Sequence, residues 1–121
     1  MCNHAYWNLS GGLVSDVKGH TLQLRTPFML PVNSVQIPTG EVRPVAGTPF
    51  DFSAATPLGA RIAQVDGGGE PGFDHNFCRV GPGAVPADSK YPLDVVATLA
   101  DPASGRVMTV STDCPGLQVY T

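Results

Sequence analysis

Short stretches of alternating polar and apolar residues recur along this chain, and they predict β-strands. Residues 20–25 alternate in this way. Residues 94–99 form a run rich in β-branched side chains that ends at a turn over residues 101–105, and residues 106–112 alternate again. We expect these two runs to pair as a hairpin across that turn. A further strand is predicted over residues 117–121.

Glycine and proline punctuate the chain between these strands. Residues 36–42 predict a turn, and residues 66–72 and 81–88 predict loops, because both are too rich in these two residues for the interior of an element. Fourteen glycines and 12 prolines leave no room for long helices. The pattern predicts an all-β fold of short strands with Gly/Pro-rich loops and little helix, organised as a sandwich or barrel.

Composition narrows the class of protein further. The chain has 121 residues, enough for one domain of ordinary size, and its formal net charge is only -3. Charged residues make up 14% of the chain, where soluble domains have about 25%. A segment that packs against further parts of a protein would show the same deficit. The sequence has no basic cluster and no apolar run of membrane-spanning length, so we expect no nucleic-acid partner and no membrane contact.

The cysteines and the N-terminus bear on the cellular compartment. Cys2, Cys78 and Cys114 are scattered and odd in number, which argues against a disulfide framework and against structural zinc. We expect buried free thiols in a reducing compartment. No basic region followed by an apolar stretch opens the chain, so no secretory signal is visible. The expected location is the cytoplasm.

Four short motifs follow one another along the chain. The first is N-H-A-Y-W-N-L at residues 3–9. The second is I-P-T-G-E at residues 37–41, continued by P-V-A-G-T-P-F-D-F at residues 44–52. The third is G-F-D-H-N-F at residues 72–77, and the fourth is S-G-R-V followed by P-G-L-Q-V-Y-T, which ends at Thr121. Each motif is weak alone, but together they cover nearly the whole chain and resemble the motifs of the aldose 1-epimerase (galactose mutarotase) family, whose first motif is N-H-x-Y-F-N-L.

The resemblance implies a fold, a reaction and a set of site residues. The fold would be part of a large antiparallel β-sandwich of the galactose mutarotase type, with residues 1–121 as a single partial domain. The reaction would interconvert the α and β anomers of free hexoses such as glucose or galactose, without a metal or an organic cofactor. A glutamate would deprotonate the anomeric hydroxyl while a histidine protonates the ring oxygen, so that the ring opens and recloses.

Individual residues fall on family positions. His4 falls on the catalytic acid, and imidazole can give and retake a proton near neutral pH. Asp74 falls on a sugar-binding aspartate and Gln118 on a glutamine of the same site. Tyr6 is a candidate sugar-stacking residue, the alternative being an aromatic residue of the core. In extended segments Asp74 would share a face with Asn76, Gln118 with Tyr120, and His4 with Tyr6 and Asn8.

The two other histidines have simpler interpretations. His75 follows Asp74 and, if this segment is a strand, would face the opposite side, which favours a structural role. His20 lies in a polar–apolar alternation and is expected to be exposed.

One departure from the family pattern concerns the catalytic base. The family's glutamate lies well beyond the P-G-x-Q-x-Y-T motif, and the glutamates here are Glu41 and Glu70, both in turns or loops. We therefore expect the chain to be a central fragment or a truncated member that is weakly active or inactive alone. Strands taken from the middle of a sandwich leave unpaired edges, so we expect it to self-associate or to pair with the missing segments.

Two other functions compete with the isomerase. A non-catalytic carbohydrate-binding β-sandwich module would keep Asp74 and Gln118 and bind a monosaccharide without turning it over. A purely structural β-domain would bind no sugar.

Overall fold

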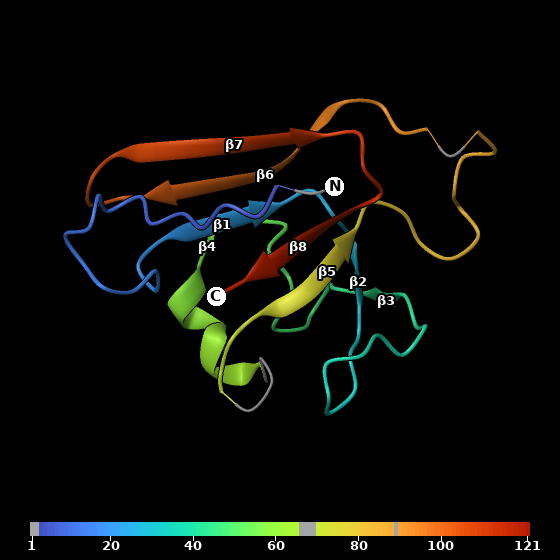
Figure 1. Cartoon of the computed structure of the whole chain (residues 1–121), viewed down its shortest axis with the longest axis horizontal. Coiled ribbons are helices and arrows are strands. Elements are labelled where there is room, and N and C mark those ends of the chain that lie inside the picture. Colours follow the sequence, from blue (N-terminus) through green and yellow to red (C-terminus); the bar gives the residue numbers. More distant parts are fainter. Residues whose placement is uncertain (1–2, 66–69, 89) are drawn as a thin grey trace.

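In the computed structural model, which describes residues 3–65, 70–88 and 90–121, the chain is built almost entirely of short antiparallel strands (Figure 1). The elements are β1 Thr21–Leu24, β2 Phe28–Leu30, β3 Arg43–Pro44, β4 Thr56–Pro57, the 3-10 helices η1 Leu58–Ala60 and η2 Ile62–Gln64, β5 Asp74–Cys78, β6 Asp94–Asp101, β7 Arg106–Thr112 and β8 Gly116–Tyr120. The predicted all-β class is confirmed.

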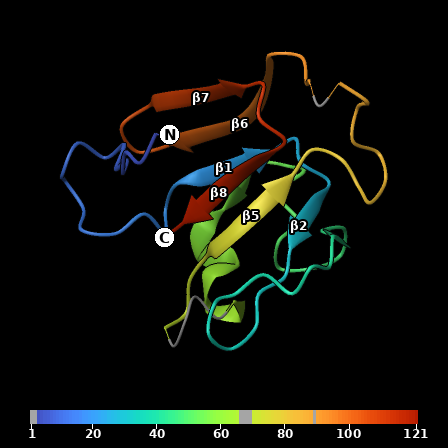
Figure 2. The ribbon, with the colours of Figure 1, turned by 45° about the vertical axis from the view of Figure 1, so that its right-hand side comes forward.

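The strands described form two four-stranded sheets. The first has the order β4-β1-β6-β7 and the second the order β3-β2-β5-β8 (Figures 1 and 2). Only Arg25, Thr26 and Pro27 separate β1 from β2, so the chain passes from one sheet to the other within three residues. Because every pairing is antiparallel, short loops can join the sequential strands.

The predicted hairpin is confirmed as β6 and β7. Its register runs from Asp94 opposite Thr112 to Asp101 opposite Arg106. The turn closes with a 2.9 Å hydrogen bond from the Gly105 backbone N–H to the Asp101 carbonyl, and Gly105 has a φ of 72°. That positive φ is unfavourable for residues with a Cβ atom, so the sequence needs glycine at this corner.

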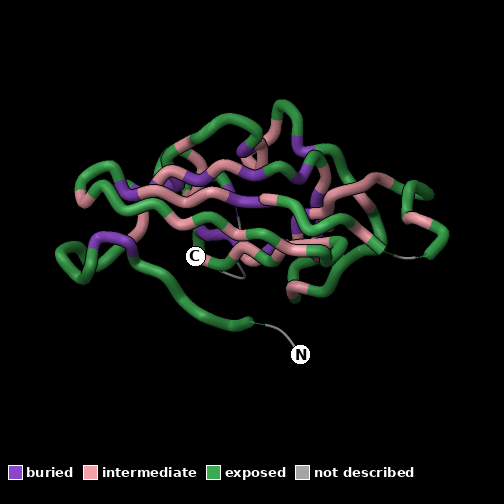
Figure 3. The backbone as a smooth tube through the Cα atoms, turned by 90° about the horizontal axis from the view of Figure 1, so that it is seen from above, coloured by how far each residue is buried: buried purple, intermediate pink, exposed green. Residues whose placement is uncertain are grey.

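One hydrophobic core lies between the two sheets. It takes Leu22 and Val96 from the first sheet and Met29 and Phe77 from the second. Side chains alternate across each sheet, so these inward positions leave the intervening side chains on the outer faces. In Figure 3 the buried stretches run through the middle of the molecule, and the exposed N-terminal stretch leads into a buried turn.

The predicted loops agree with the structure where it describes them. The turn lies slightly earlier than predicted, since the Gln36 N–H donates to the Asn33 carbonyl at 3.0 Å. Within residues 36–42 the chain bends at Gln36 and at Gly40, whose φ angles are 62° and 88°. Residues 81–88 lack regular secondary structure. Of the predicted loop at 66–72, residues 66–69 lie outside the described residues. Within the described ranges, no helix is long and apolar enough to cross a membrane.

The prediction of buried thiols is only partly right. Cys78 is half-buried on β5, and burial raises the pKa of its thiol. Cys114 is exposed in the turn between β7 and β8, so the prediction is wrong for this residue. Its place between two strands, next to Pro115, puts it in a connection, and connections run over the surface. Cys2 lies outside the described residues.

Candidate functional site

Polar side chains gather on the outer face of β5 and β8. Asp74 lies opposite Tyr120, and Asn76 lies opposite Gln118. The alternate residues of β5, His75 and Phe77, are buried on the core side. The predicted alternation is therefore confirmed: Asp74 shares a face with Asn76, and Gln118 with Tyr120.

A directional series of hydrogen bonds crosses this face. The Gln118 side-chain Nε2 donates to Asp74 Oδ1 at 2.8 Å. The Asn76 side-chain Nδ2 donates to Gln118 Oε1 at 3.4 Å, and the Cys78 Sγ donates to Asn76 Oδ1 at 3.7 Å. The two candidate sugar-binding residues are thus in direct contact although 44 positions separate them in the sequence.

Aromatic rings extend the same face toward the N-terminus. The Tyr6 and Tyr120 rings meet edge to face, with centroids 5.9 Å apart, and the Tyr6 and His4 rings are 5.4 Å apart. Because Tyr120 lies opposite Asp74, the ring series connects His4 to the Asp74–Gln118 pair. All four residues singled out from the sequence therefore belong to one connected surface. We refer to this surface, formed by His4, Tyr6, Asp74, Asn76, Gln118 and Tyr120, as the β5–β8 face.

The exposure of Tyr6 decides between its two interpretations. Its side chain is 69% exposed, so Tyr6 is not a core aromatic residue. An exposed ring next to a second one presents an apolar surface that can pack on the C–H groups of a sugar ring. Trp7 is also largely exposed, but no ring contact connects it to the β5–β8 face among the described residues.

His75 occupies the structural position expected of it. The ring is buried on the core side of β5, with its centroid 4.7 Å from that of Phe50. Its Nδ1 accepts a hydrogen bond from the Asp74 backbone N–H at 3.2 Å.

The prediction that His20 is exposed is wrong. Its side chain is 1% exposed, and its Nε2 accepts a 2.8 Å hydrogen bond from the Leu9 backbone N–H. A sequence signal for this burial was available, because His20 has the same two-residue phase as Leu22 and Leu24, which are buried.

Leu9 joins the N-terminal stretch to the rest of the molecule. Its carbonyl oxygen accepts hydrogen bonds from Ser104 Oγ and from the Arg106 guanidinium, each at 2.9 Å. Its N–H donates to His20, the residue directly before β1, so both of its backbone polar groups are hydrogen-bonded. This anchor lies five residues after His4 and fixes where the His4 stretch leaves the body of the protein.

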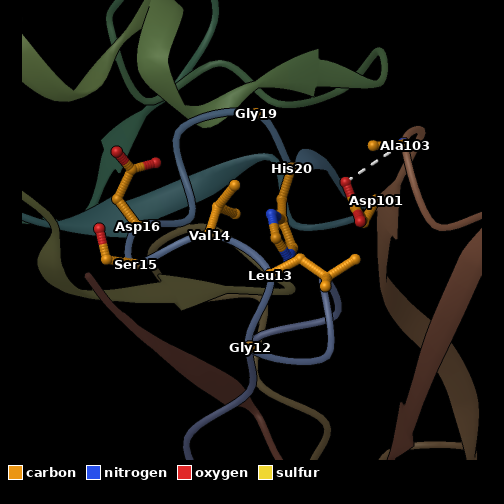
Figure 4. Close-up of a pocket in the computed structure, with 9 residues that line it drawn as sticks. All are labelled: Gly12, Leu13, Val14, Ser15, Asp16, Gly19, His20, Asp101 and Ala103. Carbon is orange, nitrogen blue, oxygen red and sulfur yellow. Dashed lines mark hydrogen bonds between the residues drawn. The ribbon is translucent and has the colours of Figure 1, made fainter.

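A surface cavity of about 700 Å³ lies beside this anchor (Figure 4). It is lined by Gly12, Leu13, Val14, Ser15, Asp16, Gly19, His20, Asp101 and Ala103. Hydrogen bonding with Ser104 holds the pKa of the Asp101 carboxyl below its ordinary value. No residue of the β5–β8 face lines this cavity, so the cavity and the candidate site are separate places.

Similarity to known proteins covers the whole chain. The model of the aldose 1-epimerase family matches residues 1–121. Galactose mutarotase from Homo sapiens is 38% identical over 121 residues, which are 100% of this chain and 32% of that protein. Aldose 1-epimerase from Escherichia coli (strain K12) is 35% identical over 122 residues, 100% of this chain and 33% of that protein. The chain therefore spans about a third of the length of these relatives.

A solved structure agrees with the fold. The crystal structure of the GalM/aldose epimerase homologue from C. elegans superposes with a TM-score of 0.75 at 24% sequence identity. The match covers 98% of this chain and 32% of that one. The chain thus has the fold of part of an aldose epimerase sandwich.

Proposed function

This chain belongs to the aldose 1-epimerase family, and from that premise we propose that its β5–β8 face binds a free hexose whose anomers His4 helps to interconvert. One observation carries the proposal. The Asp74–Gln118 hydrogen bond lies on an outer face of the second sheet, and the Tyr120 and Tyr6 rings connect that pair to His4.

The chemistry of the face suits a monosaccharide. A carboxylate such as that of Asp74 accepts hydrogen bonds from ring hydroxyls, and the Gln118 amide offers both donors and an acceptor. Asp74 Oδ1 is taken by Gln118, while Oδ2 accepts no hydrogen bond from the described residues and can receive a sugar hydroxyl. The exposed rings of Tyr6 and Tyr120 supply an apolar surface for the C–H groups of the same sugar.

In the reaction, His4 would act as the general acid. A base removes the proton from the anomeric hydroxyl while the imidazole of His4 gives a proton to the ring oxygen, and the C1–O5 bond breaks. Rotation about the C1–C2 bond then presents either face of the aldehyde to the O5 hydroxyl. On reclosure, the O5 proton returns to His4 and the base returns its proton to the former carbonyl oxygen, which becomes the anomeric hydroxyl. Proton transfer by one positioned group typically contributes about 10²–10⁴-fold in rate.

Glu41 is poorly suited to be the base. Its Oε2 forms a 2.7 Å ion pair with the Arg43 guanidinium, and hydrogen bonding to Arg43 holds the pKa of the Glu41 carboxyl below its ordinary value. A weaker base takes up a proton less readily. Arg43 lies on β3, at the opposite edge of the second sheet from β8. We therefore assign the base to a group other than Glu41.

We also propose the setting in which the site works. Both sheets share one core, which supports a single partial β-sandwich domain over residues 1–121. The described cysteines are free thiols, which supports a reducing compartment such as the cytoplasm.

Polarimetry of freshly dissolved α-D-galactose and α-D-glucose tests the proposal. Acetate in the buffer can stand in for a carboxylate base, so we expect the chain to accelerate mutarotation above the buffer rate in acetate. His4→Ala should return the rate to that of buffer, whereas Leu13→Ala, an exposed control on the same stretch, should not. Sugar binding without acceleration would favour a non-catalytic carbohydrate-binding module. Absence of binding would favour a structural β-domain.

A further inference from the structure

We propose that Asn76 and Gly116 form a positioning pair that sets the orientation of the Gln118 amide against Asp74. The inference rests on the proposed function for its effect on sugar binding, but its geometry stands on the contacts of the β5–β8 face alone. Neither residue needs to touch the sugar to act.

The first step concerns the two ends of the Gln118 amide. Its Oε1 accepts from the Asn76 side chain and its Nε2 donates to Asp74 Oδ1. If the amide turned over, its oxygen would face the Asp74 carboxylate and its NH2 group would face the Asn76 NH2 group. Both contacts would then be between like ends, acceptor to acceptor and donor to donor. The Asn76 donor thus selects the orientation in which Gln118 donates to Asp74.

The second step concerns the orientation of Asn76 itself. Its Oδ1 accepts from the Cys78 thiol at 3.7 Å, which leaves its NH2 group directed at Gln118. Burial raises the pKa of Cys78, so the thiol retains the proton that it donates. Every donor in the series therefore points the same way, from Cys78 through Asn76 and Gln118 to Asp74.

The third step is an independent observation on Gly116. This residue lies opposite Cys78 on β8, and a Cβ atom built on it would overlap Asn76 Oδ1. The φ of Gly116 is outside the left-handed region, so backbone conformation does not demand glycine here. A Cβ atom at this position would instead displace the Asn76 amide, because that amide lies across the place that a side chain would fill. Glycine at 116 therefore allows the Asn76 side chain to keep its place beside Gln118.

The consequence for a ligand is preorganisation. With Gln118 held by Asn76, the Asp74 carboxylate keeps one oxygen bound and presents the other in a defined place. Because the two side chains are already ordered, a ligand binds without the entropic cost of fixing them.

Two variants test the proposal. Asn76→Asp has the same shape but replaces the NH2 donor by a carboxylate oxygen. The Gln118 amide would then lie between two carboxylates, and in either orientation its oxygen would face one of them and lose that hydrogen bond. Gly116→Ala places a methyl group where Asn76 Oδ1 lies. The control is Gly19→Ala, because a Cβ atom there would meet nothing within 4 Å and the φ is ordinary.

The first readout needs no sugar. We expect the side-chain amide ¹⁵N–¹H resonances of Gln118 to shift, and their hydrogen exchange to speed up, in Asn76→Asp and Gly116→Ala but not in Gly19→Ala. The second readout is the galactose dissociation constant, expected to rise about tenfold in Asn76→Asp, as for a lost hydrogen bond to a charged group.

Unchanged Gln118 resonances in the folded Asn76→Asp variant would overturn the proposal, and so would wild-type galactose affinity in it. If Gly116→Ala fails to fold, Asn76→Asp alone decides. If the unmodified chain binds no galactose, the proposed function fails, while the Gln118 resonances still decide whether Asn76 and Gly116 position the pair.

Discussion

At the scale of single residues, His20 is connected to the candidate site through Leu9 and the N-terminal stretch that carries His4. The ring is buried at the start of β1, and its Nε2 is the acceptor for the Leu9 N–H. Leu9 is the point at which the stretch carrying His4 is anchored. A buried N–H without an acceptor is costly, so loss of this ring nitrogen would loosen the anchor.

We expect His20→Phe to lower the free energy of unfolding by about 1–3 kcal/mol, the usual cost of an unsatisfied buried polar group. His20→Gln should recover part of this loss, because the glutamine amide can place an acceptor near the Nε2 position. Urea denaturation measures the free energy, and hydrogen exchange at the Leu9 amide reports the bond itself. Equal stability and equal Leu9 exchange in the two variants would contradict the role given to His20.

The positions that share a face of one strand could be predicted from the sequence, but the contacts between neighbouring strands could not. Alternation alone placed Asp74 with Asn76 and Gln118 with Tyr120 on shared faces. The bond between Gln118 and Asp74 depends on the register of β5 against β8, and a shift of one residue would move every side chain to the other face. That register is set by tertiary packing, which the local pattern does not contain.

At the scale of elements, β5 separates the core from the site by alternation along five residues. Phe77 is fully buried, while its neighbour Asn76 lies on the β5–β8 face. Substitutions at these two adjacent positions should therefore differ, one lowering the stability of the fold and the other disturbing the candidate site.

We expect Phe77→Ala to cost about 3–5 kcal/mol of stability through the lost burial and the cavity left behind. Asn76→Ala should change stability by no more than about 0.5 kcal/mol, as for a surface substitution, while disturbing Gln118. Thermal and urea unfolding of the two variants measure this difference. Comparable losses at both positions would show that β5 does not divide core from site in the register described.

The elements recovered from the sequence are those long enough to show a period. The strand β1, the hairpin of β6 and β7, and the strand β8 were all predicted. The short strands β2, β3 and β4 were not, since two or three residues show no alternation, and Pro44 and Pro57 are residues that disfavour strands. Each of them is paired in the sheet: β4 with β1, β3 with β2, and β2 also with β5.

At the scale of the whole molecule, each sheet in the described part of the chain has a long strand at one of its two edges. β7 is the outermost strand of the first sheet and β8 of the second. An outermost strand presents backbone donors and acceptors that can pair with another strand. Val107 on β7 and Tyr120 on β8 add exposed apolar surface, at 65% and 58% exposure.

We expect the 121-residue chain to associate in a concentration-dependent way through these edges. Val107→Lys should weaken association, because a charged side chain on an edge strand opposes pairing with another edge. Size-exclusion chromatography over a range of concentrations measures the effect. A compact monomer at every concentration would contradict the expectation.

Titration with galactose, followed by ¹⁵N–¹H NMR, shows whether the β5–β8 face is a hexose site. We expect saturable shifts concentrated at Asp74, Gln118, Tyr120 and Tyr6, with no more than small shifts around the cavity beside His20. Asp74→Ala should remove the saturation while the spectrum remains that of a folded protein. No saturable shift, or shifts centred elsewhere in the assigned residues, would show that the β5–β8 face does not bind the sugar.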